Sequence, residues 1–295
     1  MRYRGLKEIR ERFNQGENVL GILRKEDGRN ELDSILISYD LQSGSYREHF
    51  KHNPDPKENY CNHLAESIDE LGGVKSILHV GVGECITLAL TLNRMKRRPE
   101  RVFALDISWS RLHHGRVFCE EQGVEGVELM VADLFRIPLP DNSVDLVLTN
   151  HSLEPNGGRE REALKELCRV ANKYVLMNEP AYEFADEKGR ARIDEMGYVK
   201  NLGEHARQLG YSPLKHEPFI CSMNPTNPTG TVLLDVSGPK QKAPVKPFYV
   251  CPVSHLPLEQ KQGVLCAEDG MLVYPILNGI PCLHADNGIV ASHFV

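Results

Sequence analysis

The sequence has no long apolar stretch, and no window approaches the roughly 18 uninterrupted apolar residues of a membrane span. Its first residues, MRYRGLKEIRERFNQG, are charged and lack the apolar core of a secretory signal. A positive net charge is also lacking, because 41 acidic residues outnumber 35 Lys and Arg and give −6 at pH 7. Such a chain has no overall field for non-specific nucleic-acid binding. We therefore expect a cytoplasmic protein without membrane contact.

Paired zinc-binding cysteines are lacking too, although the chain has eight cysteines. A structural zinc site needs four ligands, usually from two Cys-x-x-Cys pairs. Near the C-terminus, Cys251 is followed three residues later by Ser254, and Cys266 by Asp269. Half of the thiolates are thus missing, and the remaining substitutes are His255, Cys282 and His284. We expect reduced thiols and no bound metal.

A regular alternation of short apolar strands and amphipathic helices is present from about residue 61 onward. It predicts a mostly parallel sheet with helices on both faces, which is a doubly wound α/β fold. The expected strands are residues 76–81, 101–106, 127–132, 144–150, 173–178, 214–222 and 229–236. The expected helices are residues 63–71, 85–95, 109–123, 159–170 and 199–210.

Four segments follow from this pattern. Residues 1–60 hold a basic helical stretch, the alternating ILISYD and a polar Pro-containing segment, and we interpret them as an N-terminal extension. Residues 61–236 form the α/β domain. Residues 237–246 are rich in Pro and Lys and indicate a linker, after which residues 247–295 form a second, small unit.

The stretch SILHVGVGEC places Gly81 and Gly83 directly after an expected buried strand. Glycine there lets the chain turn sharply and lets a ligand approach the backbone. Asp106 ends the next strand, 23 residues after Gly83, where an acid meets ribose hydroxyls in such sheets. Asp133 ends the third strand and is placed to meet an adenine amino group. Dinucleotide enzymes usually have a third glycine where this chain has Ile86, which counts against NAD.

The series ILHVGVGEC, ALDIS, VADLFRIPLPDNSVDLVLTN and KYVLMNEP resembles the class I S-adenosylmethionine-dependent methyltransferases across about residues 60–236. The resemblance implies a seven-stranded Rossmann-like sheet, S-adenosylmethionine as cofactor and S-adenosylhomocysteine as product. It also implies that Gly81 and Gly83 pass under the methionine and ribose, that Asp106 binds the ribose and that Asp133 lies by the adenine. Further expected cofactor contacts are Ile107, Leu134 and Asn150.

Two residues depart from that family's glycine loop. The acid common two positions before the first glycine is His79 here, and the third small residue is Cys85. A neutral imidazole can orient the loop but offers no charge to the cofactor's ammonium group. Glu84 is the candidate replacement, and the alternative is that Glu84 only favours the first turn of a helix. We include His79 and Glu84 among the cofactor contacts.

The candidate catalytic residues follow the fourth and fifth strands and the N-terminal extension. Methyl transfer is an in-line displacement, so the protein must position the reactants and, for a hydroxyl, remove one proton. We expect His151 to be the base, unless it only lines the cleft, and Glu179 is a weaker candidate. Tyr46, with Tyr39, lies in a segment that in related enzymes folds over the cofactor as a helical lid. The alternative for both tyrosines is packing against the sheet edge.

The C-terminal stretch from FYVCPVSH to NGIPCLHAD resembles a zinc-ribbon-like family that includes the activator subunit of several tRNA and translation-factor methyltransferases. The resemblance covers residues 246–285. It implies a small β-rich unit that covers an apolar strip of the catalytic domain.

Three functions remain open at this point. The first is O-methylation of a small metabolite or sugar-type acceptor, which the net acidity favours. The second is a tRNA- or protein-modifying methyltransferase, which the C-terminal unit and a basic run favour; the third is a cofactor-binding scaffold without turnover. The basic run comprises Arg94, Lys96, Arg97, Arg98 and Arg101, and its alternative is a solvated cluster at a helix C-terminus. The sequence does not indicate an oligomeric state.

Overall fold

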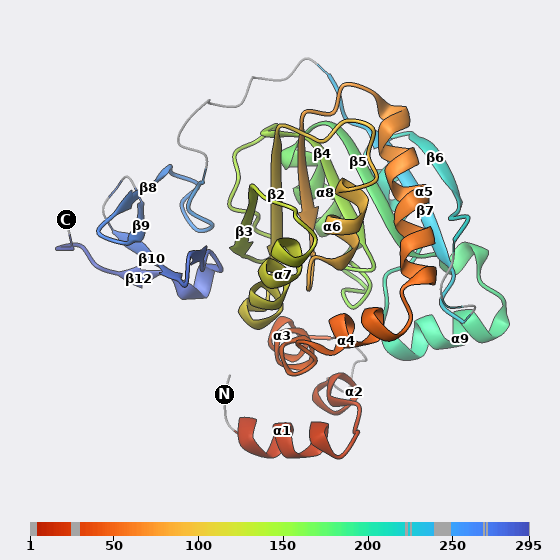
Figure 1. Ribbon diagram of the computed structural model, residues 1–295, viewed down its shortest axis with the longest axis horizontal. Coiled ribbons are helices and arrows are strands. Elements are labelled where there is room, and N and C mark those ends of the chain that lie inside the picture. The colour runs from red at the N-terminus through yellow and green to blue at the C-terminus, as the bar shows by residue number, and fades with distance from the viewer. Residues whose placement is uncertain are drawn as a thin grey trace.

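A twisted seven-stranded sheet forms the centre of the molecule (Figure 1). The structure is a computed structural model that describes residues 5–24, 30–221, 224, 226–238, 249–267, 269 and 271–294, so most of the expected linker lies outside the described residues. The strand order is β3-β2-β1-β4-β5-β7-β6, with the first five strands parallel and β7 antiparallel to both neighbours. The strands are β1 (Ser76–Val80), β2 (Arg101–Asp106), β3 (Val127–Val131), β4 (Val144–Asn150), β5 (Ala171–Pro180), β6 (Pro213–Pro218) and β7 (Thr229–Asp235).

Helices cover both faces of this sheet because successive strand residues point to opposite sides. In β1, Ile77 and Leu78 belong to two different hydrophobic cores. One core includes α5 (Asp55–Leu71), α6 (Ile86–Leu92) and α7 (Trp109–Glu121), and the other includes α8 (Glu160–Val170) and α10 (Leu202–Gln208). The short η1 (Tyr182–Phe184) and helix α9 (Glu187–Met196) follow β5. Among the described residues, no helix combines the length and the apolar character needed to cross a bilayer.

The N-terminal extension is helical and lies beyond one end of the sheet (Figure 1). It comprises α1 (Leu6–Asn14), α2 (Val19–Leu23), α3 (Leu32–Leu41) and α4 (Ser45–His52). The alternating ILISYD forms part of α3, where Ile35 and Ser38 are buried. The Ser108 hydroxyl donates to Oδ1 of Asp40 at 2.6 Å and thereby fixes α3 to the turn after β2. Helix α5 begins at Asp55, earlier than the expected residue 63, because proline and acidic residues favour a first helical turn there.

The C-terminal unit is a five-stranded sheet that packs beside β3 (Figure 1). The backbone N–H of Leu283 donates to the carbonyl of Val131 at 2.7 Å, next to a bridge between Val131 and Cys282. Tyr274 and Leu283 are fully buried in the core that α8 also covers. The elements are β8 (Leu258–Lys261), β9 (Val264–Ala267), β10 (Leu272–Leu277), β11 (Ile280–Pro281), η2 (Ala285–Asn287) and β12 (Ile289–Val290). The expected α/β class, seven-stranded sheet and β-rich C-terminal unit are confirmed.

Candidate functional site

The loop after β1 requires glycine for two separate reasons. Gly81 and Gly83 have φ angles of 65° and 57°, a region that residues with a Cβ rarely adopt. A Cβ on Gly81 would lie 2.2 Å from the Cβ of Ser152, in the loop after β4. A Cβ on Gly83 would lie 2.5 Å from Nη2 of Arg111, on α7. The loop is therefore packed tightly against residues that follow two neighbouring strands.

Asp106 ties the turns after β1 and β2 together. Its Oδ2 atom accepts from the N–H of Gly83 at 2.8 Å, and its Oδ1 atom accepts from the N–H of Ser108 at 2.9 Å. The residue is only 4% exposed. Because the carboxyl ends of β1 and β2 meet at this edge of the sheet, Asp106 lies where ligands collect in open α/β folds.

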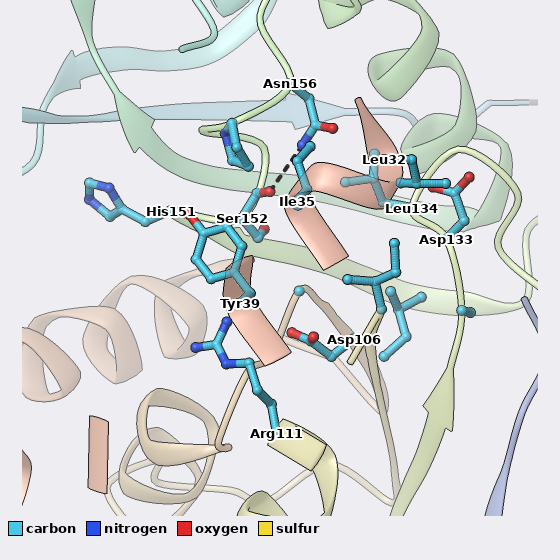
Figure 2. A pocket seen from close by; sticks show the side chains of 15 residues that line it. Leu32, Ile35, Tyr39, Asp106, Arg111, Asp133, Leu134, His151, Ser152 and Asn156 are labelled. Atoms are coloured by element: carbon cyan, nitrogen blue, oxygen red, sulfur yellow. Dashed lines mark hydrogen bonds between the residues drawn. The ribbon is translucent and has the colours of Figure 1, made fainter. Parts of the chain in front are cut away.

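A first cavity lies over this loop, and five expected cofactor contacts line it (Figure 2). These contacts are Gly81, Asp106, Ile107, Asp133 and Leu134. Helix α3 covers the cavity with Leu32, Ile35 and Tyr39. Its volume is about 70 Å³, whereas pockets for drug-sized ligands occupy roughly 300–1,000 Å³. The first cavity alone is therefore smaller than a nucleoside-sized ligand.

Asp133 borders the far side of the first cavity, at the end of β3. Its Oδ1 atom accepts from the N–H of Phe135 at 3.0 Å. Burial raises the pKa of Asp133 above its ordinary value, although this hydrogen bond opposes the shift. Asp133 therefore places a carboxyl group in the wall of the first cavity.

Glu84 and His79, the two expected cofactor contacts that flank the glycines, have partners of their own. Oε1 and Oε2 of Glu84 accept from the N–H groups of Gly44 and Arg47, each at 2.9 Å, so the carboxylate caps the start of α4. Glu84 thus connects the glycine loop to the N-terminal helices. His79 is buried and lines neither cavity, and burial lowers its pKa to about 3, so the imidazole is neutral.

Asn150 connects His79 to a buried polar chain. Its Nδ2 atom lies 3.3 Å from Nε2 of His79, which accepts the hydrogen bond. Its Oδ1 atom accepts from the hydroxyl of Tyr60 at 2.9 Å and from Nδ2 of Asn178 at 3.1 Å. Oδ1 of Asn178 in turn accepts from Thr231 at 2.7 Å. These bonds fix the carboxyl ends of β1, β4 and β5 against α5.

His151 follows β4 and lies between two polar partners. Its φ of 50° is in the left-handed region, which turns the imidazole out of the strand direction. Nδ1 lies 2.7 Å from Oε2 of Glu154, and Nε2 lies 2.7 Å from Oγ1 of Thr229. A carboxylate can only accept, so Nδ1 carries the proton and Nε2 accepts from the threonine hydroxyl. Nε2 therefore holds the lone pair that a general base needs.

The pKa of His151 reflects opposing influences. Burial lowers it, but the hydrogen bond and charge of Glu154, together with the charge of Glu179, outweigh burial and raise the pKa above 6.5. The ammonium of Lys57 lowers it slightly. The imidazole therefore holds a proton more tightly than a free histidine does, which favours its acceptance of a proton from a ligand.

Glu179 supports the loop that carries His151. Its Oε1 atom accepts from the N–H of Ser152 at 3.0 Å, and Oε2 accepts from the N–H of Glu154 at 3.2 Å. Glu179 is 1% exposed, and burial raises its pKa to about 7 against the opposing charge of His151. It lines neither cavity, so its carboxyl positions the loop and does not face a ligand.

A second cavity of about 270 Å³ adjoins the first. The two share Tyr39, Gly81, Arg111 and His151, which form their boundary. Tyr46 lines the second cavity, and partial burial raises the pKa of its phenol, so it is not a base at neutral pH. The other lining residues are Lys57, Tyr60, Val82, Glu84, Ile86, Thr87, Asn150, Glu154, Asn224, Asn227 and Thr229.

Two cations at this site were not among the sequence-based candidates. The guanidinium of Arg111 lies 4.7 Å from the ring centroid of Tyr46 and 5.3 Å from that of Tyr39, and the side chain borders both cavities. Figure 2 shows Arg111 and Tyr39 at the first cavity. Its only sequence signal is its place in the first turn of the helix that follows Asp106. Lys57 comes from α5, and nothing in its local sequence indicates a ligand-facing role.

The C-terminal cysteines do not assemble a metal site within the part of the chain that the structure describes. No group of three or more His, Cys, Asp or Glu side chains there is arranged to hold a metal ion. Sγ of Cys251 instead lies 3.2 Å from the hydroxyl of Tyr274 and accepts from the N–H of Ser254 at 3.4 Å. All eight cysteines are free thiols.

Comparison with known proteins agrees with this geometry. Residues 78–174 match the family model described as a methyltransferase domain. The chain contains a methyltransferase domain. It is accordingly an enzyme of the methyltransferase class, and S-adenosylmethionine is its cofactor.

Two solved structures share the fold of the methyltransferase domain. One is the complex between the Haloferax volcanii Trm112 methyltransferase activator and a methyltransferase; it is 13% identical over 70% of this chain and 100% of that chain, with a TM-score of 0.52. The other is magnesium protoporphyrin IX methyltransferase from Synechocystis PCC 6803 with bound S-adenosylhomocysteine; it is 12% identical over 68% of this chain and 98% of that chain, also with a TM-score of 0.52.

The residues of the methyltransferase domain suit its cofactor. The glycine loop leaves space that a Cβ would fill, and Asp106 and Asp133 line the first cavity with carboxyl groups, which can accept hydrogen bonds of the kind that hydroxyl and amino groups donate. Nε of Arg111 is buried and has no hydrogen-bond partner among the described residues, so the boundary of the cavities offers a free donor to an anionic group. These features fit a nucleoside that carries an amino acid.

Proposed function

We propose that the enzyme methylates an oxygen atom of a small metabolite or sugar-type acceptor in the second cavity, and that His151 removes the acceptor's proton. The observation that carries this proposal is the contact between Nδ1 of His151 and the carboxylate of Glu154, which assigns the ring proton to Nδ1. Its Nδ1–H donates to Glu154, so the lone pair of Nε2 is directed to Thr229 Oγ1, and both residues line the second cavity. An acceptor hydroxyl can take the place of the threonine hydroxyl at Nε2.

The proton has a defined route in this arrangement. S-adenosylmethionine, when bound, supplies a methyl group on a positively charged sulfur. Nε2 of His151 takes the proton as the acceptor oxygen forms its new bond, and the carboxylate of Glu154 stabilises the resulting imidazolium. Glu179 keeps the loop in place through the N–H groups of Ser152 and Glu154. Such general base catalysis contributes about 10²–10⁴-fold in rate.

The position of the basic run supports a small acceptor. Arg94 follows α6, and Arg101 begins β2 at the amino edge of the sheet, whereas the cavities lie at the carboxyl edge. Arg94 pairs with Glu58, and Arg101 pairs with Glu128. The run therefore does not guide a polynucleotide toward His151.

A macromolecular acceptor is the second candidate, and the C-terminal unit favours it. This unit joins β3 through Leu283 and shares a core with the methyltransferase domain. One structural neighbour is a methyltransferase in complex with a separate activator protein. We propose that the C-terminal unit acts as an activator within the same chain.

Labelling with radioactive cofactor tests the proposed function. Calorimetry first checks that the intact protein binds S-adenosylhomocysteine. A cell extract is then incubated with the enzyme and methyl-labelled S-adenosylmethionine and is fractionated by size. We expect label in the small-molecule fraction.

The variant His151→Asn tests the base, because asparagine tolerates the φ of 50° at this position. We expect its transfer rate to fall about 10²–10⁴-fold, with unchanged affinity for S-adenosylhomocysteine. His63→Asn, on the solvent side of α5, is the matched control. Label in RNA or protein would favour the second candidate, and cofactor binding without any label would indicate a scaffold without turnover.

A further inference from the structure

Two cysteines meet where the glycine loop packs against α7. Cys85 lies at the end of the loop, directly before α6, and its φ of 57° is in the left-handed region. A Cβ built on Gly115 of α7 would lie 2.6 Å from Sγ of Cys85, so this sulfur rests on the backbone of α7. Cys119 follows Gly115 by four residues on the same helix and therefore occupies the same face. The two thiols form a hydrogen bond, in which Cys85 donates to Cys119.

The two thiols differ in exposure and in acidity. Cys85 is fully buried, whereas Cys119 is 4% exposed. The hydrogen bond from Cys85 lowers the pKa of Cys119 in spite of burial, and the positive charge of Arg98 acts in the same direction. The same hydrogen bond, together with burial, raises the pKa of Cys85. Because the thiolate is the nucleophile, Cys119 is the sulfur that reacts first with an oxidant, and Cys85 is placed to react with the product.

Cys85 belongs to the segment that shapes the first cavity. Its N–H donates to the carbonyl of Val82 at 3.2 Å within the glycine loop. Two residues earlier, the N–H of Gly83 donates to Asp106, which lines the first cavity. Glu84 lies between them and caps the start of α4. A shift of Cys85 therefore acts on the wall of the cavity and on the N-terminal helices together.

We propose that Cys85 and Cys119 form an oxidative modification site, at which a hydroperoxide converts the two thiols into a reversible disulfide that weakens cofactor binding. This inference goes beyond the proposed function, since it concerns the cofactor loop and needs no acceptor.

The reaction takes place in two steps. The thiolate of Cys119 attacks one oxygen of hydrogen peroxide, the O–O bond breaks, and hydroxide leaves a sulfenic acid on Cys119. The sulfur of Cys85 gives up its proton and attacks Sγ of Cys119, the S–O bond breaks, and the S–S bond forms. The protons of the two thiols and the two peroxide oxygens leave as two water molecules. The peroxide is reduced, and each sulfur loses one electron.

The disulfide alters the loop because it shortens a contact that is already tight. The two sulfurs of a disulfide lie about 2.05 Å apart, which is shorter than a hydrogen-bonded distance. Sγ of Cys85 cannot move straight toward α7, because the backbone at Gly115 lies there. We therefore expect Cys85 to shift along α7 toward Cys119 and to displace Gly83 and Glu84 with it.

Hydrogen peroxide and the full-length protein test the inference. Peptide mapping by mass spectrometry without a reductant should detect a disulfide between the peptides that carry Cys85 and Cys119. Calorimetry should show that S-adenosylhomocysteine binds the oxidised protein about tenfold or more weakly than the reduced protein. Dithiothreitol should restore the affinity, because it reduces a disulfide but not a sulfinic acid or a methionine sulfoxide.

Variants identify the sulfurs that are responsible. Cys119→Ser keeps a hydrogen-bonding group but cannot form the disulfide, so its affinity for S-adenosylhomocysteine should equal that of the reduced wild type and should not respond to peroxide. Cys119→Ala is a second variant without the reactive sulfur, and urea unfolding checks that both are folded. Cys168→Ser is the matched control, because Cys168 on α8 is also 4% exposed. This control should lose affinity on oxidation as the wild type does.

Each outcome decides the inference. The linked peptide is detected without cofactor or acceptor, so its absence overturns the modification site even if the proposed function is correct. A linked peptide with unchanged affinity for S-adenosylhomocysteine would overturn the effect on the cofactor loop. Equal losses of affinity in Cys119→Ser and the wild type, or a loss that dithiothreitol does not reverse, would show that another oxidation product is responsible. The proposed function, in contrast, fails only through the labelling experiments.

Discussion

Nδ1 of His151 lies 2.7 Å from Oε2 of Glu154, three residues further along the same loop. This contact decides which ring nitrogen carries the proton and therefore which one faces the second cavity as a base. The loop is itself fixed by Glu179, which accepts from the N–H groups of Ser152 and Glu154. The geometry of the base thus depends on a carboxyl that does not line either cavity.

The first prediction concerns the titration of His151. Because the negative charge of Glu154 raises the pKa of His151, Glu154→Gln should lower that pKa and shift the rising limb of the pH–rate profile to lower pH. Lys57 acts in the opposite direction, so Lys57→Gln should raise the pKa. NMR titration of the His151 ring measures both shifts without any acceptor. Shifts of the same sign in the two variants would contradict the arrangement of charges.

The second prediction concerns the glycine loop. In Gly81→Ala the new Cβ meets Ser152 at 2.2 Å, in addition to the strain of a φ of 65°. We expect a loss of about 1 kcal/mol from the backbone and a further 1–3 kcal/mol, roughly, from overpacking. Urea unfolding measures the free energy, and calorimetry should show weakened binding of S-adenosylhomocysteine.

A matched control separates the two costs of Gly81→Ala, which are backbone strain and overpacking against Ser152. Gly123 has a nearly identical φ of 66°, but no atom lies within 4 Å of a Cβ built there. Gly123→Ala should therefore cost only the backbone part. In a background of Ser152→Gly, the cost of Gly81→Ala should also decrease, since the clashing Cβ is gone. Equal losses for Gly81→Ala and Gly123→Ala would refute the packing argument.

The third prediction concerns Glu179 and pH. Burial raises its pKa in the folded protein to about 7, from 4.5. Folding therefore favours the neutral form of Glu179. The stability that this neutral carboxyl contributes to the folded protein is fully present below pH 4.5 and is lost as the pH rises to about 7. The glutamine in Glu179→Gln stays neutral at every pH. The free energy of unfolding of this variant minus that of the wild type should therefore increase between pH 4.5 and pH 7, by on the order of 3 kcal/mol.

Urea unfolding at pH 4.5, 6 and 7.5 measures this difference. Glu125→Gln, in the exposed loop before β3, controls for the loss of a carboxyl group from the chain. A difference between Glu179→Gln and the wild type that is constant with pH would show that Glu179 is ionised throughout the range. The stability of the His151 loop would then depend on a charged carboxylate.

The parts of the site on the sheet were predictable from the sequence because local patterns determine them. Gly81, Asp106 and Asp133 each follow a short apolar strand, and parallel strands bring their carboxyl ends to one edge. The boundaries of β2 and β4 follow directly from the apolar runs RVFALD and VDLVLTN. No long-range information was needed for these positions.

The remaining parts depend on contacts between segments that are distant in sequence. Glu84 is engaged by the backbone of α4, 37 to 40 residues earlier, so its charge cannot be assigned from the loop alone. ILISYD alternates in the sequence but forms the helix α3, which packs over the first cavity and bonds Ser108 through Asp40. Lys57 reaches the second cavity only because α5 packs against α6. Tertiary packing, which local periodicity does not encode, decides these positions.

The last prediction concerns the C-terminal unit and the stability of the whole chain. Leu283 is fully buried in the core shared with the methyltransferase domain, and its N–H donates to Val131 of β3. Leu283→Ala should cost about 2–5 kcal/mol in the free energy of unfolding. Leu277→Ala is the matched control. Because Leu277 is 51% exposed, this substitution should lower the free energy of unfolding by less than about 0.5 kcal/mol. Unfolding is followed by the fluorescence of Trp109, which lies on α7. If the C-terminal unit supports the methyltransferase domain, both units should unfold in one transition, and Leu283→Ala should shift that transition. A separate early transition that leaves S-adenosylhomocysteine binding intact would show that the two units are stable independently.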